Sequence, residues 1–250
     1  MKRVLQRLTE SLRRQDWAGV VIEFAIVVLG VFVGIQASNW NQQRHDRAEE
    51  RRFYRQLIGD LRVDLGTLKF AALRSRQFDA SAERVLVAAK EGLQPNYSRG
   101  RFASDVTYGG YIYLPTPATR TIDELTSTGS IGLLRNERAK AAISRYYRDF
   151  EDRRQWEALL REQQALYWQA TAGVLPRKAV QASVRFREPS ISEAEAQAIL
   201  KRVRDRPMIS DLLHSMAEYQ ERVRRDSERL DQSARALIRI LQPLAGENSA

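Results

Sequence analysis

The chain has 250 residues, of which 43% are hydrophobic and 29% charged, and a mean hydropathy of −0.48 argues against a polytopic membrane protein. Its 41 lysines and arginines, interleaved with 31 acids, give a net charge of +10 and are typical of solvated helix faces. With no cysteine and only two histidines, the sequence offers no disulfide framework and little material for a metal centre.

A basic tail over residues 1–16 precedes an apolar segment over 17–40, which we predict to be a transmembrane helix. The 22 residues between Trp17 and Trp40 would extend about 33 Å as a helix, which matches the roughly 30 Å hydrocarbon core of a bilayer. The two tryptophans suit the lipid headgroup level as membrane-interface anchors. The apolar part is longer than that of a signal peptide and no convincing cleavage site closes it. We therefore expect an uncleaved anchor rather than a buried core helix.

An acid and several small residues share one face of this predicted span. At about 100° per residue, Glu23, Gly30, Gly34 and Ser38 lie along one side of the helix. Small residues at such steps let two helices approach closely, so we predict a homo-oligomer interface in which the Glu23 carboxyl group hydrogen-bonds to its twin. In the alternative, Glu23 reaches the lipid interface or pairs with a nearby arginine, and the glycine spacing arises by chance.

The span is predicted to continue into a long juxtamembrane helix over residues 41–91. Its apolar residues recur at three- and four-residue steps, which is typical of a coiled-coil-like stripe, although Asp64 and Ser75 interrupt it. The stripe consists of Tyr54, Leu57, Leu61, Leu68, Ala71, Phe78, Ala82, Val85 and Ala89.

Residues 92–135 are predicted to form an irregular connection with one short helix, because three prolines and a glycine pair interrupt the helical pattern. The stretch VTYGGYIYL (106–114) could form a small hairpin around its glycines. Thr121 with Glu124 predicts a capping box that opens the short helix, which should stop near Gly129.

Residues 136–250 are predicted to form a helical hairpin that completes the bundle. Asn136 should cap a long helix that runs to about Thr171, and Ser192 with Glu195 should cap a short one. The apolar stripe of the long helix consists of Ala139, Ile143, Tyr146, Phe150, Trp156, Leu160 and Tyr167.

Ser210 should cap the last helix, which has the most regular spacing of apolar residues if Asp226 and Ser233 are accepted as polar members. Its stripe consists of Leu212, Met216, Tyr219, Val223, Leu230, Leu237, Ile240 and Leu244. The predicted fold class is therefore all-α, with one N-terminal transmembrane helix continuing into a long-helix antiparallel bundle.

No catalytic constellation is evident. The sequence contains no phosphate-binding glycine loop, zinc-protease motif, nucleophile elbow or calcium loop. We predict no catalytic, cofactor-binding or metal site, and a protein that is not an enzyme. Nucleic-acid binding is an alternative suggested by RYYRDFEDRRQW (145–156), but the aromatic residues of this stretch fall largely on the core stripe.

The order of these features resembles a family of uncharacterised single-span bacterial proteins, defined only as a domain of unknown function. The resemblance covers mainly residues 17–65 and 115–150, and nothing in 176–210 contributes to it. It rests on Glu23, Gly30, Asn39-Trp40-Asn41, Glu124-Leu125, Gly129 and Tyr146-Tyr147. What it implies is membrane attachment and a bacterial source, without any chemistry.

The basic residues flanking the span are balanced, with five in 2–16 and five in 44–55. A short basic tail before a first span usually stays inside, so we predict a bacterial inner-membrane protein with a cytoplasmic N-terminus and a periplasmic domain. It should act by interaction, as a scaffold, sensor or accessory subunit of an envelope complex. Its expected partners are the lipid bilayer, a second copy and an unidentified membrane or envelope protein. The alternative is a cytoplasm-facing basic bundle that binds nucleic acid or acts as a membrane effector in a defence system.

Overall fold

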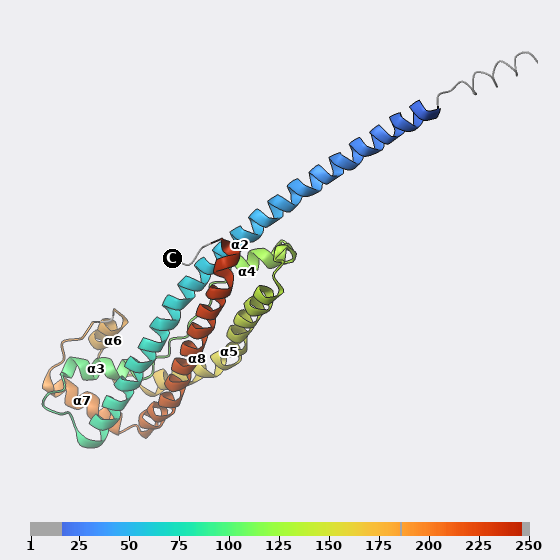
Figure 1. Ribbon diagram of the computed structural model, residues 1–250. Helices are drawn as coiled ribbons and strands as arrows, with labels where there is room; N and C mark the ends of the chain where they lie inside the picture. Colours follow the sequence, from blue (N-terminus) through green and yellow to red (C-terminus); the bar gives the residue numbers. More distant parts are fainter. Residues whose placement is uncertain (1–16, 186, 247–250) are drawn as a thin grey trace, which may run out of the picture. The chain divides into compact units, whose positions relative to one another are not determined.

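The computed structural model describes residues 17–185 and 187–246, and all regular structure in these ranges is helical (Figure 1). The helices are α2 (Trp17–Glu91), α3 (Arg99–Tyr108), α4 (Arg120–Ser127), the 3-10 helix η1 (Ser130–Leu133), α5 (Glu137–Ala170), α6 (Arg177–Val184), α7 (Glu193–Arg204) and α8 (Pro207–Ala245). The all-α prediction is confirmed. The basic tail over 1–16 and the side chain of Trp17 lie outside the described residues.

Helix α2 contributes to two compact units, Met1–Arg51 and Arg52–Ala250. In the second unit it packs antiparallel against α8, beside α5 (Figure 1). The Ser75 hydroxyl donates to the carbonyl oxygen of Gln220, and Arg76 forms an ion pair with Glu228 at 3.0 Å. The predicted antiparallel bundle of long helices is thus confirmed.

Two hydrophobic clusters fill the bundle, and the apolar stripes of α2, α5 and α8 contribute to both. The first joins residues 53–68 of α2 to α4, α5 and the second half of α8. The second joins residues 82–88 of α2 to α3, α6, α7 and the first half of α8. The stripe predicted on α2 is buried as expected, apart from Ala89, which is half-buried.

The two polar interruptions of the α2 stripe are buried and hydrogen-bonded. Asp64 is 1% exposed, and its carboxylate accepts from the Ala118 backbone N–H at 2.7 Å and from the Tyr146 hydroxyl at 2.8 Å. Burial raises the pKa of this carboxyl group, and the two hydrogen bonds oppose the rise. Asp64 therefore fixes the segment before α4 onto α2 and α5.

The capping box predicted at Thr121 is wrong. Helix α4 begins at Arg120 with Thr119 at its N-cap position, two residues before the predicted cap, and has no side-chain cap of its own. The Thr121 backbone N–H donates instead to the carboxylate of Asp60 on α2, at 3.0 Å. A carboxylate from a neighbouring helix satisfies the free N–H group that a local cap would otherwise bind.

The hairpin predicted over 106–114 is also wrong, because its first three residues are the end of α3. The Ser98 side chain caps α3 by accepting from the Arg101 N–H. Gly109 and Gly110 serve close packing rather than a turn between strands. A Cβ atom at Gly109 would lie 2.8 Å from Leu213 Cδ2, and one at Gly110 would overlap the Tyr167 ring.

The caps predicted for α5 and α7 are confirmed. Asn136 Oδ1 accepts from the Ala139 N–H at 2.9 Å, and Ser192 forms a complete capping box with Glu195. The cap predicted at Ser210 is wrong, because α8 begins at Pro207 and Ser210 lies within the helix. Proline suits the first turn of a helix, where its missing N–H would have no partner.

The apolar stripes of α5 and α8 also differ from prediction. Trp156 is 43% exposed rather than buried. On α8 the buried polar positions are Gln220 and Ser227, whereas Asp226 and Ser233 are only half-buried. The buried residues of α8 still follow one heptad register, but its second series lies one residue after the predicted one, at Leu213, Gln220, Ser227, Ala234 and Leu241. Helix α6 was not predicted.

Candidate functional site

The predicted transmembrane segment is fully exposed in the described residues. Its large apolar side chains are between 48% exposed, at Val28, and 70% exposed, at Phe24. By length and composition this helix could cross a membrane, and the apolar part has no buried residue. Surface of this kind needs an apolar covering, which a bilayer or another helix would supply.

Each predicted interface residue of the span lies on the open surface of α2. Glu23, Gly30, Gly34 and Ser38 are exposed, and a Cβ atom at either glycine would meet nothing within 4 Å. Trp40 is 63% exposed, and the guanidinium carbon of Arg44 lies 4.8 Å from its ring centroid. The face is therefore accessible to a second helix, and its role as an oligomer interface stays a prediction.

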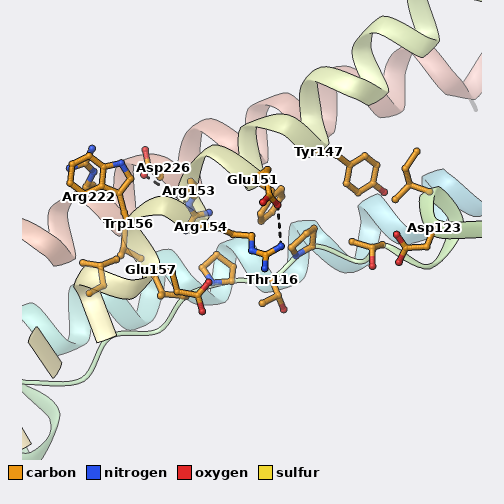
Figure 2. A pocket seen from close by; sticks show the side chains of 18 residues that line it. Thr116, Asp123, Tyr147, Glu151, Arg153, Arg154, Trp156, Glu157, Arg222 and Asp226 are labelled. Carbon is orange, nitrogen blue, oxygen red and sulfur yellow. Dashed lines mark hydrogen bonds and ion pairs between the residues drawn. The ribbon is translucent and has the colours of Figure 1, made fainter. Parts of the chain in front are cut away.

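A pocket of about 460 Å³ lies within the bundle domain, between the 114–119 segment, α4, α5 and α8 (Figure 2). Its apolar wall consists of Leu114, Pro115, Pro117, Ile122, Phe150, Leu160 and Val223. Volumes of this size and concave apolar walls with a few polar groups are typical of small-ligand sites. Sequence analysis did not predict this pocket.

Arg153 is the least satisfied charged group of the pocket. Its side chain is 12% exposed and its Nε lies 4.0 Å from Asp226 Oδ2, which is the limit of an ion pair. Its guanidinium carbon stands 5.7 Å from the Phe150 ring centroid. Burial lowers the pKa of Arg153, but an arginine remains charged in a folded protein. Its Nη1 is buried without a hydrogen-bond partner among the described residues.

Two further arginines line the same pocket (Figure 2). The guanidinium carbon of Arg222 on α8 lies 3.8 Å from the Trp156 ring centroid, in a stacked cation–π contact. Arg154 donates to Glu151 at 3.2 Å, one turn back on α5. The pocket therefore places an aromatic platform and a buried, incompletely bonded cation next to each other.

This arrangement can bind a small ligand. A ligand with an apolar body and an acceptor oxygen could pack on Trp156 and Leu160 and accept from Arg153 Nη1. No cluster of metal-ligating side chains occurs among the described residues. In the sequence, the signal for this site was the RRQW stretch, where two arginines and a tryptophan occur together. Arg222 on α8, which stacks on Trp156, lies 66 residues after it in the chain. The spacing of residues in the sequence therefore could not pair the two.

Comparison with known proteins finds no relative: no family model, no curated protein and no solved structure matches the chain. The resemblance drawn from residues 17–65 and 115–150 therefore stays a prediction. The functional argument rests on the geometry described above.

Proposed function

We propose that this protein is a single-span membrane protein whose helical bundle is a binding module, serving as a sensor, scaffold or accessory subunit of an envelope complex. The span anchors the bundle to a lipid bilayer. The bundle engages its ligand or partner through the pocket beside Arg153 and Trp156. Catalysis, a cofactor and a metal play no part in this proposal.

One observation carries the membrane assignment. The apolar part of α2 is unburied over its whole length, whereas residues 52–91 of the same helix bury a continuous apolar stripe in the bundle. A soluble protein that left so many large apolar side chains in water would aggregate. An N-terminal helix of this length and composition also occurs in signal sequences, so the proposal requires that the segment be retained.

The orientation and the partners follow as parts of the same proposal. We place the N-terminus in the cytoplasm and the bundle in the periplasm of a bacterial inner membrane, with a second copy bound along the Glu23, Gly30 and Gly34 face. Nucleic acid is not a partner in this scheme. Many arginines on the bundle are paired with acids along their own helices, as Arg235 is with Asp231 at 2.7 Å.

The proposal is tested by fusing alkaline phosphatase and, separately, green fluorescent protein after Ala250 in a bacterial host. We expect phosphatase activity without fluorescence, and full-length chain that resists carbonate extraction from membranes. Deletion of residues 17–40 is the matched control and should give a soluble, phosphatase-inactive fusion. Fluorescence without phosphatase activity would reverse the orientation, and a mature chain lacking 17–40 would overturn the anchor.

A further inference from the structure

A second pocket, of about 330 Å³, lies between α2, α3 and the segment that follows α6. It differs from the first in being mainly polar and in having three arginines against one acid on its wall. Helix α2 contributes Arg74 and helix α3 contributes Arg101, while Arg187 and Glu188 come from the segment after α6. Its size is at the lower end of small-ligand sites.

Ser104 gives this pocket a buried donor without a partner. The residue is 4% exposed and lines the pocket, one turn from Arg101 on α3. Its Oγ is buried and has no hydrogen-bond partner among the described residues. Buried hydroxyl groups are nearly always hydrogen-bonded, so an unpartnered one on a pocket wall is a candidate donor to a ligand.

Arg101 is held at the pocket by a carboxylate that is already well satisfied. Asp105 is fully buried and accepts from Ser81 at 2.7 Å, from Arg84 Nε at 2.7 Å and from Tyr97 at 2.8 Å. Arg101 Nε reaches the same carboxylate only at 3.3 Å, and its side chain is 55% exposed. The donors of Arg101 that face away from Asp105 remain available to a ligand.

Arg187 is positioned by close packing of its own segment on α3. A Cβ atom at Gly100 would collide with the carbonyl oxygen of Pro189 and lie 2.8 Å from Glu188 Cγ. The carboxylate of Glu188 accepts a hydrogen bond from Ser98 at the start of α3. Glu188, the one acid on the pocket wall, is therefore already hydrogen-bonded to Ser98. Among the described residues, no acid forms an ion pair with Arg187.

We propose that this pocket binds the phosphoryl group of a small anionic ligand through the guanidinium groups of Arg74, Arg101 and Arg187 and the hydroxyl group of Ser104. Guanidinium groups from three segments of the chain match the several acceptor oxygens and the charge of a phosphoryl group, whereas one carboxylate is satisfied by a single arginine. Phe78 and Tyr108 complete the wall and offer apolar surface to the rest of the ligand. This inference does not depend on the membrane anchor or on the first pocket.

The test uses the full chain in dodecyl maltoside, a detergent without phosphate, and follows thermal unfolding at constant ionic strength. We expect inorganic phosphate at about 100 times its Kd to raise Tm by about 5 °C, and chloride or acetate to leave Tm unchanged. Adding phosphatidylglycerol to the micelles separates a lipid headgroup from a free phosphate as the source of the phosphoryl group. Stabilisation by either one supports the proposal, provided that Arg187 is required.

Two variants and a matched control decide the outcome. Arg187→Gln and Ser104→Ala should each weaken phosphate binding by about tenfold, since each removes one donor to a charged group. Both variants should fold, because Arg187 is exposed and Ser104→Ala removes a hydroxyl that has no partner. Arg185→Gln removes the same charge two residues away, outside the pocket, and should change the affinity less than twofold. Equal losses in the Arg185 and Arg187 variants, or no stabilisation by phosphate or phosphatidylglycerol, would overturn the proposal.

Discussion

Arg153 illustrates how a single buried charge can lower the stability of a fold. Its guanidinium group is largely buried beside Phe150, yet Asp226 stands at the limit of ion-pair distance and Nη1 has no partner among the described residues. A buried charge with incomplete hydrogen bonding costs free energy, and apolar replacement of such groups often stabilises a protein. In the proposed function this cost is offset by ligand binding at the pocket wall.

Replacing Arg153 with methionine should therefore raise the free energy of unfolding, by about 1 kcal/mol, because methionine keeps the apolar stem and removes the buried charge. Asp226 keeps Arg229 as an ion-pair partner at 3.6 Å. The measurement is urea unfolding of the full chain in detergent, followed by circular dichroism. Arg154→Met is the matched control, since Arg154 is 71% exposed on the same helix, and should change stability by less than about 0.5 kcal/mol. A lower free energy of unfolding in the Arg153 variant would show that this arginine stabilises the fold.

At the scale of elements, the end of α3 shows how closely two helices can pack. Helix α3 is followed by Gly109 and Gly110, and the second of these lies against the ring of Tyr167 on α5. That tyrosine is fully buried, and its hydroxyl donates to the Val106 carbonyl oxygen at 2.6 Å. The ring is therefore fixed from both sides and cannot make room for a larger residue at 110.

Gly110→Ala should lower the free energy of unfolding by about 2–3 kcal/mol, in the range of an overpacked core. The new Cβ atom would lie 2.5 Å from Tyr167 Cγ and closer still to two other ring carbons. Thermal unfolding of the full chain measures the effect as a fall in Tm. Gly132→Ala, in η1, adds a methyl group where nothing lies within 4 Å and should leave Tm nearly unchanged. Equal Tm values for the two variants would show that α3 can move away from α5.

At the scale of the whole molecule, the predicted span presents an exposed apolar face that no described residue of the same chain covers. The described residues of one copy provide nothing that covers Gly30 or Gly34. If lipid alone covers this face, a bulky residue there is harmless. If a second copy covers it, the same residue separates the two helices, because small residues are what permits their close approach.

Gly30→Leu combined with Gly34→Leu should reduce self-association in a bacterial membrane two-hybrid assay by about tenfold. Val28→Leu with Phe32→Leu is the matched control, because it places leucines at the same spacing on the opposite side of the helix. Neither glycine has a neighbour within 4 Å, so the leucines create no clash within one chain. Unchanged association in the glycine variant would leave the bilayer as the only covering of this face.

The sequence by itself determined the features that depend on local composition and spacing. These are the length of the apolar segment, the apolar stripe of α2, and the caps at Asn136 and Ser192, in which the interacting groups are three residues apart. Periodic apolar residues bury one face of a helix whatever its neighbours are, so such patterns are readable without a structure.

Only the tertiary structure decided the contacts between residues that are distant in the chain. Asp60 replaces a local cap at α4, Gln220 rather than Asp226 enters the core, and α3 takes the place of a hairpin. Both pockets are formed in the same way, from helices whose relative rotation and register the sequence pattern leaves open. The physical reason is that an apolar face requires a helix to pack against something. Which neighbour it packs against, and at what position, depends on how the side chains fit together.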